Sequence, residues 1–151
     1  MTWTRRLLVG GAVVAAACMP LSAAQAKNAD PHAKATFLGA IDVSGKHATL
    51  KVRYNCGSGQ ALWVSAKQSA SGKKDARFSR EGSSKLSSAW WQSHRNRFVC
   101  NGKPQTATVT IDKVEKGSKG TLKPGVAYVQ FCVTKGERTL ILSKSGWVKI
   151  A

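Results

Sequence analysis

The chain has 151 residues, of which 24 are lysine or arginine and 7 are aspartate or glutamate, so its formal net charge is +17 at pH 7. A positive field of this size attracts polyanions and anionic surfaces, but it does not define a fold. The length suffices for one domain with a modest core, and no nucleotide, metal or catalytic motif stands out.

The first 26 residues have the layout of a signal peptide. Arg5 and Arg6 form a short positive region, an apolar run covers residues 7–21, and residues 24–26 (AQA) supply a small-x-small cleavage pattern. The apolar run is too short and too rich in alanine to be a good membrane span. We therefore expect a bacterial protein that is secreted or associated with the cell envelope, cleaved after Ala26, with no membrane span in the mature chain. The arginines are also compatible with twin-arginine export, and residues 15–18 (AAAC) with a lipoprotein signal.

Residues 47–56 (HATLKVRYNC) show the clearest strand pattern. Every second residue from Ala48 to Cys56 is apolar, and the residues between them are polar. Because side chains alternate between the two faces of a strand, this segment predicts a central strand with one buried face. Six more strand-like runs, separated by turn residues, cover 35–43, 61–68, 105–112, 126–133, 139–143 and 147–150. The pattern predicts one all-β domain over residues 35–151, after a flexible tail over residues 27–34, and is typical of a small sandwich.

Residues 69–98 interrupt this rhythm. They are rich in serine, glycine, lysine and arginine, and they have no period of two. Leu86, Ala89 and Trp90 would share one face if residues 83–92 formed a short helix. The segment is longer than most loops of compact domains, and such loops are usually either functional or disordered. We expect it to be a long basic loop on the domain.

The long loop contains the candidate partner-binding residues. Aromatic faces beside guanidinium and ammonium groups can bind sugars, anionic polymers or extended nucleic-acid strands. In the alternative interpretation, one or both loop tryptophans close the end of the core while the basic side chains are merely solvated. Trp63 and Trp147 are assigned to packing. The candidates are Lys73, Lys74, Arg77, Arg80, Trp90, Trp91, Arg95 and Arg97.

Several short motifs resemble those of known exported domains. Cys56 at the end of an alternating strand, Trp63 in the next one, and a Leu-x-Pro-Gly corner (residues 122–125) before Tyr128 and Cys132 resemble an immunoglobulin-type sandwich. The Tyr-x-Cys strand end, the Cys-Asn-Gly turn and the late Pro-Gly strand are also similar to a family of small exported actinobacterial proteins of unknown function. This second resemblance covers roughly residues 35–151. It implies a secreted immunoglobulin-like antiparallel β-sandwich of about seven strands, with a cysteine pair like Cys56 and Cys100, and it implies no activity.

The residues themselves leave two pairings of the cysteines open. If residues 47–56 and 105–112 are antiparallel neighbours, the end of the first meets the start of the second, and Cys100 arrives near Cys56. A bridge from Cys56 to Cys132 would instead cross between two sheets. The distance between the Cα atoms of the cysteines, which must be within about 7 Å for a bridge, decides between these two pairings. The first pairing is favoured, and it would leave Cys132 as a buried free thiol once Cys18 is removed with the signal peptide.

No combination of residues supports catalysis or metal binding. His94 precedes Cys100 by six residues, which is the wrong spacing for a cysteine nucleophile of the kind considered, and a disulfide would remove the thiol. His32 and His47 are too far from His94 and from each other in sequence to resemble a metal-ligand motif, and the acidic residues show no glycosidase-like pairing. We expect a monomer that is not an enzyme and has no metal, nucleotide or other cofactor.

The charge pattern favours a binding function. The first hypothesis is a secreted, non-enzymatic binding module whose basic loop over residues 67–97 contacts an anionic cell-envelope polymer or an extracellular partner protein. The second is a secreted protease inhibitor or other protein-blocking factor, in which Lys74 or Arg80 enters the specificity pocket of an enzyme. A cationic toxin that acts on the cell envelope is a further alternative.

Overall fold

The computed structural model describes residues 30–80, 82–136 and 139–151, and the expected signal peptide lies outside them. In this part the chain forms seven strands and two short 3₁₀ helices. The strands are β1 (Lys34–Ser44), β2 (His47–Asn55), β3 (Ala61–Gln68), β4 (Ala89–Ser93), β5 (Gln105–Asp112), β6 (Gly125–Lys135) and β7 (Thr139–Ile150). The helices η1 (Ala76–Ser79) and η2 (Ser83–Lys85) both lie between β3 and β4.

The strands follow the alternation of their sequences. In β2 the residues Leu50 and Val52 are buried, whereas Lys51 and Arg53 between them are exposed. The buried residues of the strands form one core, because the apolar side of each strand faces inward. Its largest fully buried side chains include Trp91 and Phe131, and the ring of Phe131 lies 5.5 Å from that of Tyr54.

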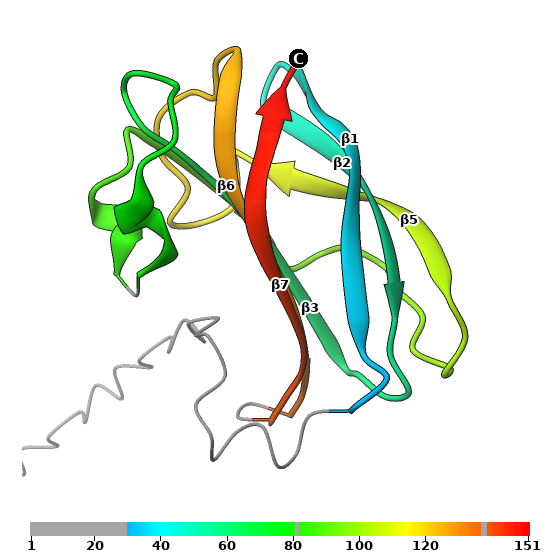
Figure 1. Cartoon of the computed structure of the whole chain (residues 1–151). Helices are drawn as coiled ribbons and strands as arrows, with labels where there is room; N and C mark the ends of the chain where they lie inside the picture. The colour runs from blue at the N-terminus through cyan, green and yellow to red at the C-terminus, as the bar shows by residue number, and fades with distance from the viewer. Residues whose placement is uncertain (1–29, 81, 137–138) are drawn as a thin grey trace, which may run out of the picture.

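The seven strands belong to one sheet that closes into a barrel (Figure 1). Their order is β1-β2-β5-β4-β3-β6-β7. Neighbours are antiparallel except β1 and β7, which close the barrel through a parallel pairing of Ile41 with Ile150. β2 and β5 are antiparallel neighbours, which is the condition on which the favoured cysteine pairing depends, with His47 opposite Asp112 and Tyr54 opposite Gln105.

The all-β class is therefore confirmed, but the architecture differs from the expected two-layer immunoglobulin-like sandwich. The difference arises from β4, which lies within the segment expected to be a loop. It pairs with β3 along its length and with β5 where Gln92 meets Asp112. This strand joins β3, β6 and β7 to β5, β2 and β1, so that the two groups form one sheet instead of two layers. The short helix considered for residues 83–92 is replaced by η2 and β4.

A side-chain amide extends the short junction between β4 and β5. Asn96 Nδ2 donates to the carbonyl oxygen of Thr110 at 2.8 Å, and Asn96 Oδ1 accepts from the Thr110 N–H at 2.7 Å. The amide carries one donor and one acceptor in the arrangement of a peptide group, so it continues the strand pairing where the backbone of β4 has ended.

The expected disulfide between Cys56 and Cys100 is present. Their Cα atoms are 4.8 Å apart, and the bond ties the end of β2 to the segment that leads into β5. The remaining expectation is corrected: Cys132 is buried and disulfide-bonded and is not a free thiol. That expectation rested on an odd count of three cysteines after removal of Cys18, which lies outside the described residues.

Residues 30–33, at the end of the expected tail, form a turn held by Asp30. Its carboxylate accepts hydrogen bonds from the backbone N–H groups of His32 and Gly57, both at 2.9 Å. These two bonds lower the pKa of Asp30, because they stabilise its ionised form. The turn thus attaches the start of β1 to the loop after β2.

Candidate functional site

The candidate binding residues fall into three groups along the chain. One group lies on the connection between β3 and β4, residues 69–88, which we call the basic segment. The second lies in β4, and the third follows the other end of β4, so the strand separates the first group from the third. The groups are Lys73, Lys74, Arg77 and Arg80; Trp90 and Trp91; and Arg95 and Arg97.

The two tryptophans lie on opposite faces of β4. Trp91 is fully buried inside the barrel, and its Nε1 donates to the carbonyl oxygen of Gly120 at 3.2 Å. Trp90 points outward and is half-buried, and its backbone pairs with that of Lys119, in the connection from β5 to β6, at 3.0 and 2.8 Å. The pair therefore forms no continuous aromatic surface, and Trp91 is part of the core, as the alternative interpretation of the tryptophans had it for at least one of them.

Phe78 attaches the basic segment to the outside of the barrel. Its ring is fully buried and stacks on Trp147 of β7 at a centroid distance of 6.1 Å. Trp147 in turn meets Tyr128 of β6 edge-on at 5.2 Å. Removing a phenylalanine side chain from water contributes roughly 2–3 kcal/mol. In Figure 1 the green segment with its two short helices lies to one side of the barrel, away from β1, β2 and β5.

A buried lysine provides a second attachment. Lys67 of β3 is 5% exposed, and its Nζ donates to Ser83 Oγ at 2.7 Å and to the carbonyl oxygen of Phe78 at 3.4 Å. The ammonium also lies 5.7 Å from the centre of the Tyr128 ring. Burial lowers the pKa of Lys67 to about 8, because leaving water disfavours the charged form. Lys67 thus links the barrel wall to both short helices.

Among the described residues, the exposed cations of the basic segment have little counter-charge. Asp75 caps η1 and pairs with Arg77, whose Nη2 lies 2.7 Å from Asp75 Oδ2. The hydrogen bonds from the Arg77 side chain and backbone lower the pKa of Asp75 to about 2, so this carboxylate is ionised and occupied by Arg77. Lys73, Lys74 and Arg80 have no carboxylate partner among the described residues.

Arg95 and Arg97 belong to a different surface. Arg95 Nε lies 4.0 Å from Glu115, which also accepts from the backbone N–H of His94 at 3.1 Å and pairs with the His94 ring. A second histidine–carboxylate pair joins His47 to Asp112. Sequence spacing could not reveal either pair, because each joins residues from separate parts of the chain.

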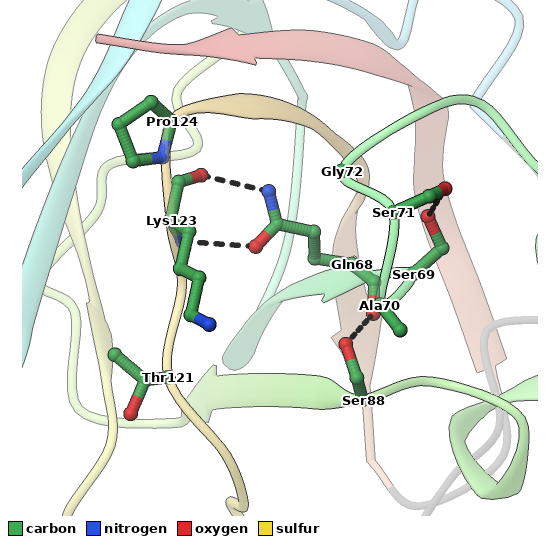
Figure 2. A pocket seen from close by; sticks show the side chains of 9 residues that line it. All are labelled: Gln68, Ser69, Ala70, Ser71, Gly72, Ser88, Thr121, Lys123 and Pro124. Atoms are coloured by element: carbon green, nitrogen blue, oxygen red, sulfur yellow. Dashed lines mark hydrogen bonds between the residues drawn. The ribbon is translucent and has the colours of Figure 1, made fainter.

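A depression opens where the basic segment begins. It has a volume of about 410 Å³ and lies between residues 69–72 and residues 121–124 (Figure 2). The side-chain amide of Gln68 connects its two sides: Nε2 donates to the carbonyl oxygen of Lys123 at 2.7 Å, and Oε1 accepts from the Lys123 N–H at 2.9 Å. Ser88 closes a third side and donates from Oγ to the Gln68 carbonyl oxygen at 3.0 Å.

Gln68 and Lys123 are site residues that the sequence did not indicate, and Lys67 appeared only as the first residue of the basic loop expected over residues 67–97. Lys67 and Gln68 end an ordinary alternating strand, and Lys123 is one cation among many. The Leu-x-Pro-Gly corner at 122–125 was noticed only as a turn. No local pattern distinguishes these residues, because their environment forms only when the basic segment folds back onto the barrel.

Comparison with known proteins does not assign the chain to a family. No family model matches the chain, and no curated protein matches it significantly. Across the described residues, no three histidine, cysteine or acidic side chains cluster in a way that could hold a metal ion. A search of the same residues finds no helix with the length and hydropathy of a membrane span.

Proposed function

We propose that the protein is an exported, non-enzymatic binding module that contacts an anionic cell-envelope polymer through the basic segment. The supporting observation is the arrangement of this segment. Two of its buried residues, Phe78 and Ser83, attach it to the barrel, while Lys73, Lys74 and Arg80 remain exposed without carboxylate partners in the described part of the chain. Holding cations in place before binding reduces the entropy lost when a polyanion docks.

Retention on a polyanion tests this proposal. The probe is immobilised alginate, a polyuronate, with neutral dextran as the reference material. We expect retention on alginate that falls steeply with salt, because each neutralised charge releases counterions. The double variant K73Q/K74Q should bind about tenfold or more weakly, since each surface cation contributes about 1 kcal/mol near an anionic surface.

The matched control is K51Q/R53Q, which removes the same charge from the exposed face of β2, on the other side of the barrel (Figure 1). This variant should retain most of its affinity for alginate. Equal losses in the two double variants would show that net charge alone drives binding. Absence of retention even at low salt would overturn the proposal.

The anchored segment also favours one alternative, a protease inhibitor, because inhibitor loops must be held in shape to resist cleavage. Lys74 lies outside the short helices and is exposed, so it is the residue that would enter a specificity pocket. Inhibition of trypsin-like proteases that is lost in K74A, together with unchanged alginate binding in K73Q/K74Q, would replace the first proposal by this one.

A further inference from the structure

We propose that the depression beside the basic segment binds one anionic sugar unit, a pyranose that carries a carboxylate or a phosphate group. The inference rests on the proposed function, since it assigns to the same surface a subsite for one unit of the polymer. Its volume of about 410 Å³ lies within the range of small-molecule sites.

The lining has the chemistry that an anionic sugar requires. The lining hydroxyl oxygens can accept hydrogen bonds from sugar hydroxyls, although Ser69 and Ser88 already donate their own protons to backbone carbonyls. One ammonium group can pair with the anionic substituent. No acidic side chain belongs to the lining, so nothing in it repels a negative ligand. Figure 2 shows Lys123 extending its ammonium group into the space between Thr121 and Ser88. The four hydroxyl residues are Ser69, Ser71, Ser88 and Thr121.

The walls are held in place before any ligand arrives. Besides the two bonds of Gln68, the Gly72 N–H donates to the Ser69 carbonyl oxygen at 3.1 Å, and the Gly72 carbonyl oxygen accepts from the Val126 N–H at 2.9 Å. This approach requires glycine at position 125, because a Cβ there would lie 2.6 Å from the Gly72 oxygen. A pocket built on such contacts needs little ordering when it binds.

The depression is continuous with the basic segment. Ser69, which lines it, donates from Oγ to the carbonyl oxygen of Lys73 at 2.8 Å, so the first exposed cation of the segment lies beside the rim. On the opposite wall, Lys113 Nζ donates to Thr121 Oγ1 at 3.1 Å and adds a second positive charge. A polymer that follows the segment can therefore place one of its units in the depression.

The experiment measures binding of single sugars and of alginate to the full exported chain. Titration calorimetry compares glucuronate and glucose 6-phosphate with glucose and inorganic phosphate, which separates carboxylate from phosphate recognition and the sugar from the anion. We expect saturable, weak binding of one or both anionic sugars, and none of glucose or free phosphate. K123Q should weaken it by about tenfold, in line with loss of a charge-assisted hydrogen bond.

Two further variants make the outcome decisive. A70W places a large ring on the exposed wall of the depression and should abolish sugar binding, whereas K135Q removes a charge at the far end of β6 and should leave it unchanged. Circular dichroism and the melting temperature confirm that each variant folds. Equal binding of the sugars by wild type, K123Q and A70W, or no sugar binding by the wild type, would overturn the inference.

The two proposals fail separately. If alginate is retained and K73Q/K74Q weakens it, but sugar binding is absent, the binding function stands without the subsite. If glucuronate or glucose 6-phosphate binds and A70W removes it while alginate is not retained, the depression is a sugar site and the polymer proposal is wrong.

Discussion

Two side-chain amides in this protein act as short pieces of strand. Asn96 bonds to both backbone groups of Thr110, and Gln68 bonds to both backbone groups of Lys123. Each amide continues the strand pairing at a place where a strand ends. Each also satisfies one partly buried backbone N–H group and one carbonyl group, which would otherwise need water as a partner. Asn96 extends the junction of β4 with β5, and Gln68 holds the walls of the candidate sugar site.

The first prediction concerns Lys67 and pH. An unfolded lysine titrates near 10.5, and burial lowers the pKa of Lys67 to about 8 in the folded protein. Between these values the unfolded chain binds more protons, so stability should rise with pH through this window. The penalty for the buried charge is present in full below pH 8 and is absent above 10.5. The shift corresponds to at most about 3 kcal/mol.

Urea unfolding of K67M across pH 8 to 10.5 checks this prediction. The variant removes the ammonium but keeps an apolar chain, and Ser83 Oγ still donates to the Phe78 carbonyl oxygen at 2.9 Å. We expect K67M to be at least as stable as wild type at pH 7 and to gain less stability as pH rises. K149M, at an exposed lysine of β7, should follow wild type. The prediction fails if wild type and K67M gain equal stability.

At the scale of elements, the basic segment is folded onto the outside of the barrel. Phe78 stacks on Trp147, and Lys67 bonds to the segment on both sides of Arg80. The exposed side chains of Lys73, Lys74 and Arg80 carry positive charge on either side of Phe78. The anchoring residues are thus separate from the residues that would contact a partner, and either set can be changed without the other.

The second prediction is that F78A releases the segment. Truncating a fully buried phenylalanine typically costs about 3–5 kcal/mol, and detachment of the segment should limit the loss to the lower part of that range. Trypsin should then cut at Lys73, Lys74 and Arg80 much faster than in wild type, as followed by mass spectrometry. L86A is the control, because Leu86 lies in the same segment but is 53% exposed. Equal cleavage of F78A and wild type would show that Phe78 is not the anchor.

At the scale of the whole molecule, the barrel closes through short junctions. β1 meets β7 at Ile41 and Ile150, and β4 meets β5 at Gln92 and Asp112. The Asn96 amide reinforces the second junction, because it bonds to Thr110 next to the pairing of Gln92 with Asp112. The disulfide acts at the other end of β5, where it ties the end of β2 to the segment that leads into β5.

The third prediction is the loss caused by removing this bond. Its cysteines are 44 residues apart, and cross-linking a loop of this length restricts the unfolded chain by about 3–4 kcal/mol. C56A/C100A should lower the free energy of unfolding by about this amount, measured by urea denaturation, with the far-UV spectrum of the β-barrel retained. Unchanged stability would show that the bond contributes nothing to the barrel.

Most strands could be predicted from the sequence. Residues 61–68 and 105–112 form strands with the expected ends, and β2 ends one residue before the predicted boundary. The Cys56–Cys100 bond is favoured over a bridge to Cys132 on the condition that β2 and β5 are antiparallel neighbours, and the structure has both the pairing and the bond. β4 could not be predicted, because its sequence, AWWQS, is short and its neighbouring serines and charges obscure any period.

The sequence by itself determined the all-β class, the alternating strands and the high positive charge, since these are properties of short stretches read one at a time. Only the tertiary structure decided that the strands close into one barrel, that Trp91 is buried, and that Lys67 lies beneath a folded basic segment. The physical reason is that burial is collective. An outward-facing residue of a strand becomes buried only when another part of the chain covers it. The local alternation of residues does not predict which outward-facing residues are covered.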